Sequence, residues 1–120
     1  MKKEKIISFL VENKFNLQSE REDVQYYNRT ITIKTTDQLI NINGVNSVIP
    51  GKIGNIDINI NILPDAEMFS NEQESDKMHN IYCCAKFQGF EFRHDHFLTD
   101  SEDDVILNIC SFLNIFGFKF

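Results

Sequence analysis

The sequence has no tryptophan, and only two prolines, five glycines and three cysteines occur among its 120 residues. Cys83, Cys84 and Cys110 are odd in number and lack the paired spacing of a zinc finger, which excludes a disulfide framework. Free thiols are typical of a reducing compartment, so we expect a cytoplasmic protein. With so few glycines, the chain also shows no nucleophile elbow and no glycine-rich oxyanion loop.

Long apolar runs are absent as well. No apolar stretch approaches the length that spans a membrane. Residues 6–11 form an apolar run after three lysines, as in a signal peptide, but Glu12 follows at once and no cleavage site appears. We therefore expect an amphipathic first helix. No linker, repeat or domain boundary interrupts the chain, so residues 1–120 should form a single domain.

Basic residues are outnumbered by acidic ones, 12 to 18, which gives a net charge of −6. Such a balance repels phosphate backbones and disfavours a nucleic-acid ligand, whereas it favours a basic protein partner. Half of the acids lie in two short tracts, which are Asp65, Glu67, Glu72, Glu74 and Asp76, and Asp100, Glu102, Asp103 and Asp104. The second tract lies where a helix begins, and there carboxylates stabilise the helix dipole.

The hydrophobic periodicity predicts an α+β domain. Helical spacing of apolar residues covers 2–13 and the segment that follows Thr99, with Asp100 or Ser101 as the N-cap and Gly117 just past the end. Period-two patterns predict strands at 26–34, 38–42 and 55–62. Residues 64–76 fit either a short helix or an acidic loop. We expect a mainly antiparallel sheet of five to six strands, covered on one face by the N-terminal and C-terminal helices.

The strand at 55–62 alternates most regularly. Ile56, Ile58, Ile60 and Ile62 share one face, and the other face carries a row of Asn55, Asp57, Asn59 and Asn61. One face should therefore be buried and the other solvated, as in a sheet covered on one side. The polar row is either a solvated surface or a surface that binds a partner.

Residues 81–96 predict a β-hairpin that turns at Gln88 and Gly89. A two-residue turn places Phe87 opposite Phe90, Cys83 opposite His94, and Ile81 opposite His96. In this register one face is apolar and ends in a thiol and two imidazoles, and the other face is charged.

This register raises the possibility of a metal site, because His79, Cys83, His94 and His96 would project from one face. Three imidazoles and a thiolate would suit tetrahedral zinc. The alternative is that the histidines lie at the rim of a core under a helix, and this interpretation is favoured because no strong ligand spacing exists. A catalytic Cys83–His94 pair would need an open cleft. We expect neither a metal, nor another cofactor, nor enzymatic activity.

The favoured function is that of a non-catalytic protein-binding domain, most simply a bacterial immunity protein that neutralises a basic, nuclease-type toxin. The expected contact residues are Asp57, Asn59, Asn61, Asp65, Glu67, Glu72, Glu74 and Asp76. The element order also resembles that of type III secretion chaperones if residues 65–75 form a helix. That resemblance implies an acidic chaperone that binds an effector protein and dimerises through this helix.

Overall fold

The computed structural model describes residues 1–34, 36–51, 53–69 and 75–118. Over these residues the elements are α1 (Glu4–Glu12), β1 (Asn16–Arg21), β2 (Val24–Lys34), β3 (Gln38–Ile42), β4 (Val45–Ile49), β5 (Ile53–Phe69), β6 (Ser75–Phe87), β7 (Phe90–Thr99) and α2 (Glu102–Asn114). An antiparallel five-stranded sheet has the order β1-β2-β5-β6-β7, and β3 pairs with β4 alone. The expected α+β class is confirmed. Neither described helix has the length and apolar character needed to cross a membrane.

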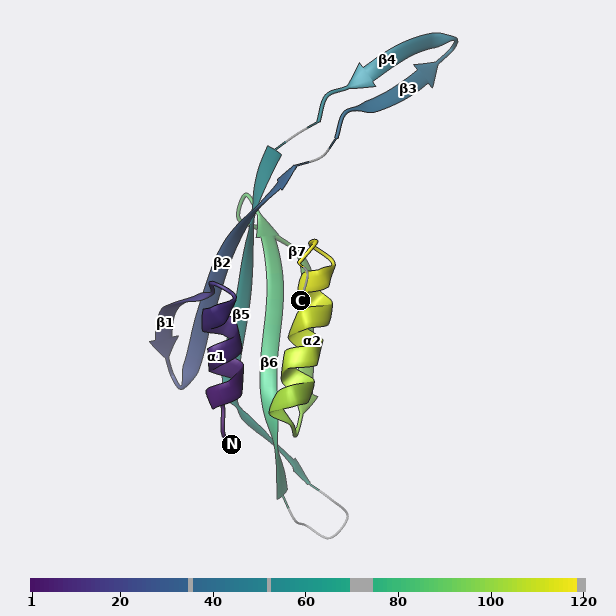
Figure 1. Cartoon of the computed structure of the whole chain (residues 1–120). Coiled ribbons are helices and arrows are strands. Elements are labelled where there is room, and N and C mark those ends of the chain that lie inside the picture. Colours follow the sequence, from purple (N-terminus) through teal and green to yellow (C-terminus); the bar gives the residue numbers. More distant parts are fainter. Residues whose placement is uncertain (35, 52, 70–74, 119–120) are drawn as a thin grey trace.

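Both helices lie on the same side of the five-stranded sheet (Figure 1). Between them and the sheet lies the core, which buries Ile58, Ile60 and Ile62 of β5 as the alternating pattern predicted. The helices contribute Ile6 and Leu10 of α1, and Val105, Ile109, Phe112 and Leu113 of α2. Ser101 accepts a hydrogen bond from the Asp104 amide and caps α2, and Gly117 follows the helix with a positive φ of 87°. Both predicted helices are therefore confirmed.

Strand β1 was not predicted from the sequence. It joins β2 through Glu22 and Asp23, whose φ angles are 53° and 64°. Two successive positive φ angles are typical of a type I′ hairpin turn, which usually contains Asn and Gly. A Glu–Asp pair is a weak turn signal, which explains why the sequence did not reveal this hairpin.

Strand β5 continues past Pro64 to Phe69, so residues 64–69 form neither the short helix nor the acidic loop that were expected. The register of β5 against β6 shifts between Leu63 and Ala66, which is a β-bulge. A bulge tolerates proline because the missing amide hydrogen is not needed in the ladder. The helix implied by the chaperone resemblance is also wrong, since residue 75 already belongs to β6 and residues 70–74 lie outside the described residues.

The β6–β7 hairpin turns at Gln88 and Gly89 with φ angles of 51° and 83°, and Phe87 lies opposite Phe90. The two-residue turn is thus confirmed. The register then shifts between Ala85 and Lys86, because β7 contains an extra residue there, Phe92. A shift of one residue exchanges the two faces of a strand. From Arg93 onward, the side chains of β7 therefore lie on the opposite face from the one that the predicted register gave them.

The β3–β4 hairpin extends away from the sheet beyond the ends of β2 and β5 (Figure 1). The molecule measures 69 × 31 × 26 Å and its radius of gyration is 18.9 Å. A compact chain of this length would have a radius of gyration of roughly 14 Å. The long axis therefore reflects an extended arm rather than a larger core. Residues 38–49, the β3–β4 hairpin, are called the arm below.

Candidate protein-binding face

The sheet face opposite the helices is not covered by any described element, and we call it the open face (Figure 1). Cross-strand hydrogen bonds run along its centre between β2 and β5. The Thr30 hydroxyl donates to Asp57 at 2.6 Å, and the Thr32 hydroxyl donates to Asn55 at 3.0 Å. The amide of Asn28 donates to Asn59 Oδ1 at 2.9 Å. The predicted polar row is therefore a ladder of paired side chains with fixed positions.

Asn61 continues the same row, with a different environment. It lies opposite Tyr26 of β2 and Tyr82 of β6, and its Oδ1 atom is buried without a hydrogen-bond partner among the described residues. A buried acceptor without a partner costs about 1–3 kcal/mol, which a donor from water or from a bound molecule would offset. Asp57, Asn59 and Asn61 thus share one face, as expected.

Next to this row, the open face carries aromatic side chains from β6 and β7. The ring of Tyr82 stacks on His94 at 6.0 Å between centroids and lies 6.4 Å from His96. The Tyr82 hydroxyl donates to Glu91, and this hydrogen bond, together with partial burial, raises the pKa of Tyr82 to about 12. His96 in turn hydrogen-bonds Asn80. Tyrosine is enriched at protein interfaces because its ring is apolar and its hydroxyl is polar.

Asp65 does not belong to this surface. Its carboxylate accepts from Lys3 Nζ at 2.6 Å and from the Met1 amino group at 3.0 Å, so it fixes the start of α1 to the β5 bulge. Partial burial raises the pKa of Asp65, but the hydrogen bonds from Lys3 and the amino terminus outweigh it and hold the pKa below its ordinary value. This carboxylate already has two cationic partners, so the expected contact role is not supported.

Two further predicted acids, Glu67 and Asp76, belong to the described residues, near the end of β5 and the start of β6. Glu67 is exposed and lies opposite Lys77 in the register. Asp76 belongs to β6, opposite Met68. Glu72 and Glu74 fall outside the described residues. Of the predicted contacts that the structure describes, Asp57, Asn59 and Asn61 lie together on the open face, and Asp65 lies apart from them.

The predicted metal ligands lie on opposite faces of the sheet. Cys83 pairs with Asp95, and His79 pairs with Thr99, so both side chains point into the core and are at most 1% exposed. His94 and His96 instead project from the open face and are exposed. The described residues contain no group of three or more His, Cys, Asp or Glu side chains that could hold a metal ion. The expectation that these four side chains share a face is therefore wrong.

The same bulge separates the predicted nucleophile pair. Cys83 is fully buried, and burial, then the negative charges of Asp95 and Cys84, raises its pKa above that of a free thiol. Burial also raises the pKa of Cys84 and of Cys110. A thiol with a raised pKa has little thiolate at neutral pH and is a poor nucleophile. Within the described part of the chain, Cys83 therefore lies opposite Asp95 rather than an imidazole, and its side chain is closed off from solvent.

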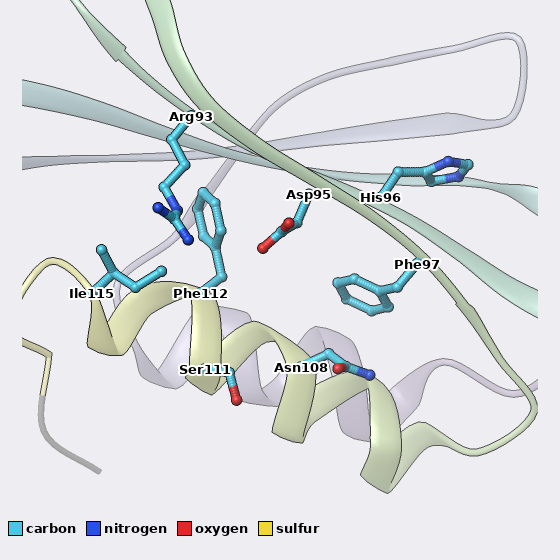
Figure 2. Close-up of a pocket in the computed structure, with 8 residues that line it drawn as sticks. All are labelled: Arg93, Asp95, His96, Phe97, Asn108, Ser111, Phe112 and Ile115. Atoms are coloured by element: carbon cyan, nitrogen blue, oxygen red, sulfur yellow. The ribbon is translucent and has the colours of Figure 1, made fainter.

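A groove that the sequence did not predict lies between β7 and α2 (Figure 2). It has a volume of about 360 Å³ and is lined by Arg93, Asp95, His96, Phe97, Asn108, Ser111, Phe112 and Ile115. Arg93, Asp95 and Phe97 point toward α2, while the His96 ring points away from it (Figure 2). A hairpin without a bulge would place Arg93 and Asp95 on the charged outer face, and the bulge at Phe92 turns them toward α2 instead.

The groove brings together a guanidinium and a carboxylate, two residues apart on a strand. Neither side chain has an ion-pair partner among the described residues. The polar groups of α2 are engaged by the helix itself, because Asn108 donates to the Asp104 carbonyl at 2.9 Å and Ser111 to the Leu107 carbonyl at 3.0 Å. The groove thus places a guanidinium and a carboxylate, neither of them ion-paired within the described part of the chain, beside the rings of Phe97 and Phe112.

We found no match to this chain among protein-family models, curated proteins or solved structures. We therefore infer function from the geometry and charge of this chain alone.

Proposed function

We propose that this chain is a non-catalytic protein-binding domain that acts as an immunity protein and neutralises a cognate basic toxin. The observation that carries the proposal is the open face, a sheet surface that no described helix covers. Its side chains are hydrogen-bonded to one another in a fixed arrangement, as in the Thr30–Asp57 and Asn28–Asn59 pairs. A surface with fixed side chains loses little conformational entropy when a partner binds.

Charge supports a cationic partner. The net charge of −6 attracts a basic protein over several ångströms and speeds its encounter. On the open face itself the acids Asp57 and Glu91 are accompanied by Lys86, which lies opposite both of them in the register of its two neighbouring strands. The whole-chain charge therefore supplies the attraction, and the open face supplies the specific contacts.

The centre of the contact surface is best placed where the polar ladder meets the aromatic side chains. Asn59 and Asn61 of β5 lie opposite Cys84 and Tyr82 of β6, so amide groups adjoin an aromatic ring. Residues near the centre of an interface dominate the binding energy, and tyrosine is enriched among them. We propose that Asp57, Asn59, Asn61 and Tyr82 contact the toxin.

The test uses, as the candidate toxin, the product of the reading frame that adjoins the gene for this chain, and the proposal expects this product to be basic. Isothermal titration calorimetry should show a one-to-one complex, and Asp57→Lys should weaken it by about tenfold or more. The matched control is Glu12→Lys on α1, which makes the same change in net charge away from the open face and should alter Kd by less than about threefold.

Two results would contradict the proposal. One is that the protein encoded next to this chain is acidic, or that it does not bind the intact chain. The other is an equal loss of affinity in Asp57→Lys and Glu12→Lys, which would show that net charge alone governs binding and that the open face is not the contact surface. Circular dichroism of both variants establishes that they are folded.

A further inference from the structure

Within the part of the chain that the structure describes, no other element lies over the faces of the arm or along its strand edges (Figure 1). Among the described residues, β3 and β4 pair with each other and with no other strand. The arm extends past the ends of β2 and β5, away from α1 and α2 (Figure 1). Each of its strands therefore presents one row of backbone amide and carbonyl groups that a further strand could bind.

Four apolar side chains of the arm are exposed. Leu39 lies opposite Val48 on one face, and Ile42 lies opposite Val45 on the other. Their exposed fractions are 73% for Leu39, 60% for Val48, 59% for Ile42 and 63% for Val45. Apolar side chains grouped on a protruding element indicate a surface that binds another protein.

The arm also lacks the features that normally prevent strand edges from pairing. Residues 38–51 contain no charged side chain, residues 38–49 contain no proline, and the register of β3 against β4 has no bulge. Charged side chains, prolines and bulges are the features that usually protect the edge strands of natural proteins from pairing. The two edge strands of the five-stranded sheet do have them, because β1 carries Glu20, Arg21 and an irregularity after Leu17, and β7 carries Arg93, Asp95 and the bulge at Phe92. The lack of protection is therefore specific to the arm.

The shape of the arm is nevertheless well defined by its turn. Asn43 and Gly44 have φ angles of 52° and 82°, as a type I′ turn requires. The Asn41 side chain accepts from the Gly44 amide at 3.2 Å and donates to Asn46 at 2.8 Å. An isolated two-stranded hairpin is only marginally stable in water, whereas one with more strands is stable. The arm would thus gain stability from an added strand without changing its shape.

We propose that the arm pairs with the arm of a second copy of this chain, so that β4 lies antiparallel to β4 of that copy. A symmetric dimer uses the same surface in both subunits, and antiparallel strands meet this requirement. Of the two arm strands, β4 is richer in β-branched side chains, with Val45, Val48 and Ile49. Pairing centred on Ser47 completes a four-stranded sheet from two hairpins.

Charge favours a second copy over a basic partner at this place. An uncharged arm offers no attraction to a cationic protein, so it is not suited to the toxin of the proposed function. Two copies of net charge −6 repel each other wherever their charged surfaces approach. Contact through the uncharged arms keeps the charged sheets and helices apart, and salt screens charges beyond about 8 Å at physiological ionic strength.

The first measurement is sedimentation velocity of the intact chain, alone, from about 1 to 200 μM. The expected result is a concentration-dependent species of twice the 14.0 kDa of the single chain. Val48→Lys should raise the dissociation constant by about tenfold or more, because the two Val48 side chains are diagonal neighbours across the new strand pair, about 7–8 Å apart. The matched control is Leu107→Lys on α2, where the exposed fraction is 64% and dimerisation should be unchanged.

A charge-swap experiment separates arm pairing from loss of folding. Val48→Lys and Val48→Glu should each be monomeric, and an equimolar mixture of the two should form a heterodimer. A monomeric wild-type chain over the whole concentration range would overturn the proposal, as would a Val48→Lys variant that dimerises like the wild type. A mixture that stays monomeric would also overturn it. None of these measurements involves the toxin, so they leave the proposed function untouched.

Discussion

Cys84 on β6 lies directly opposite His94 on β7, and both side chains belong to the open face of the sheet. One residue further along β6, Cys83 lies opposite Asp95 and points into the core. This arrangement depends on the bulge at Phe92. Phe92 and Phe97 are five residues apart, so a regular strand would place them on opposite faces. Because Phe92 is itself the extra residue of the bulge, its ring lies on the helix side and contacts Phe116 at 6.1 Å between ring centroids, while Phe97 packs against the core.

Deletion of Phe92 should therefore remove the bulge and keep the faces of β7 as they are. Lys86 would still lie opposite Glu91, and Ala85 opposite Arg93, because the extra residue is the one that has no partner in the register. The expected loss is the aromatic contact with Phe116, or about 0.5–1.5 kcal/mol beyond the lost apolar area. The measurement is a nuclear Overhauser spectrum, in which the Cys84–His94 cross-strand contact should persist. A contact between Cys83 and His94 instead would show that the register had changed.

The three thiols should differ in reactivity toward iodoacetamide at pH 8. Cys83 and Cys84 are buried, and Cys110 is partly exposed on α2. Because burial raises the pKa of all three, access decides their order, and Cys110 should be alkylated first. Peptide mapping by mass spectrometry checks this order, and in denaturant all three should react at similar rates. Alkylation of Cys83 in the folded protein as fast as Cys110 would contradict the burial described above.

Much of the fold could be predicted from the sequence because its strongest signals are local. The alternation of isoleucines in 55–62 placed β5 with its apolar face toward the core, and the helical spacing in α1 and α2 predicted both helices. The turn at Gln88 and Gly89 was also predicted, and the structure confirms it. These features depend on neighbouring residues along the chain, which is why periodicity and turn chemistry reveal them.

The candidate site was harder to predict because it depends on pairing between strands. One bulge, at Phe92, reverses which side chains of β7 face the helices, and it moved His94 and His96 away from Cys83. A second bulge, beside Pro64, turned Asp65 toward Lys3. The five-residue spacing of Phe92 and Phe97 was the available signal for the first bulge. Proline inside a continuing strand was the signal for the second.

Replacement of Asp65 by asparagine should destabilise the protein at neutral pH. The variant loses the charge-assisted hydrogen bonds from Lys3 and the amino terminus, and we expect the free energy of unfolding to fall by about 1–2 kcal/mol. Since the folded pKa of Asp65 is lowered, this contribution is present above the unfolded pKa and is lost as the pH falls through the folded pKa. Urea denaturation at neutral and strongly acidic pH should show the two proteins converging in acid.

The matched control for Asp65 is Asp103→Asn. Asp103 and Lys5 form an exposed pair at 3.8 Å, and such surface pairs contribute little to stability. This variant should lower the free energy of unfolding less than Asp65→Asn does. An equal decrease in the free energy of unfolding in both variants would show that the ion pairs of Asp65 stabilise the fold no more than an exposed surface pair does.

Protonation of His79 should weaken the fold as the pH falls below neutral. His79 is 1% exposed, its Nδ1 atom has no hydrogen-bond partner among the described residues, and burial, followed by the positive charge of Lys3, lowers its pKa. The unfolded chain takes up a proton near pH 6.5 while the folded chain stays neutral. The free energy of unfolding should therefore decrease below pH 6.5, by at most about 1.4 kcal/mol per pH unit for this one proton, until the folded pKa is reached.

The variant that isolates this effect is His79→Phe, which keeps an aromatic ring in the core and removes the titrating group. Urea denaturation at pH 7 and pH 5 should show a smaller difference in the free energy of unfolding than in the wild type, because the folded and unfolded states no longer differ in proton uptake at this position. Circular dichroism at pH 7 should show that the His79→Phe variant is folded before the two pH values are compared. A His79→Phe variant with the full wild-type difference would show that the acid sensitivity of the fold arises elsewhere.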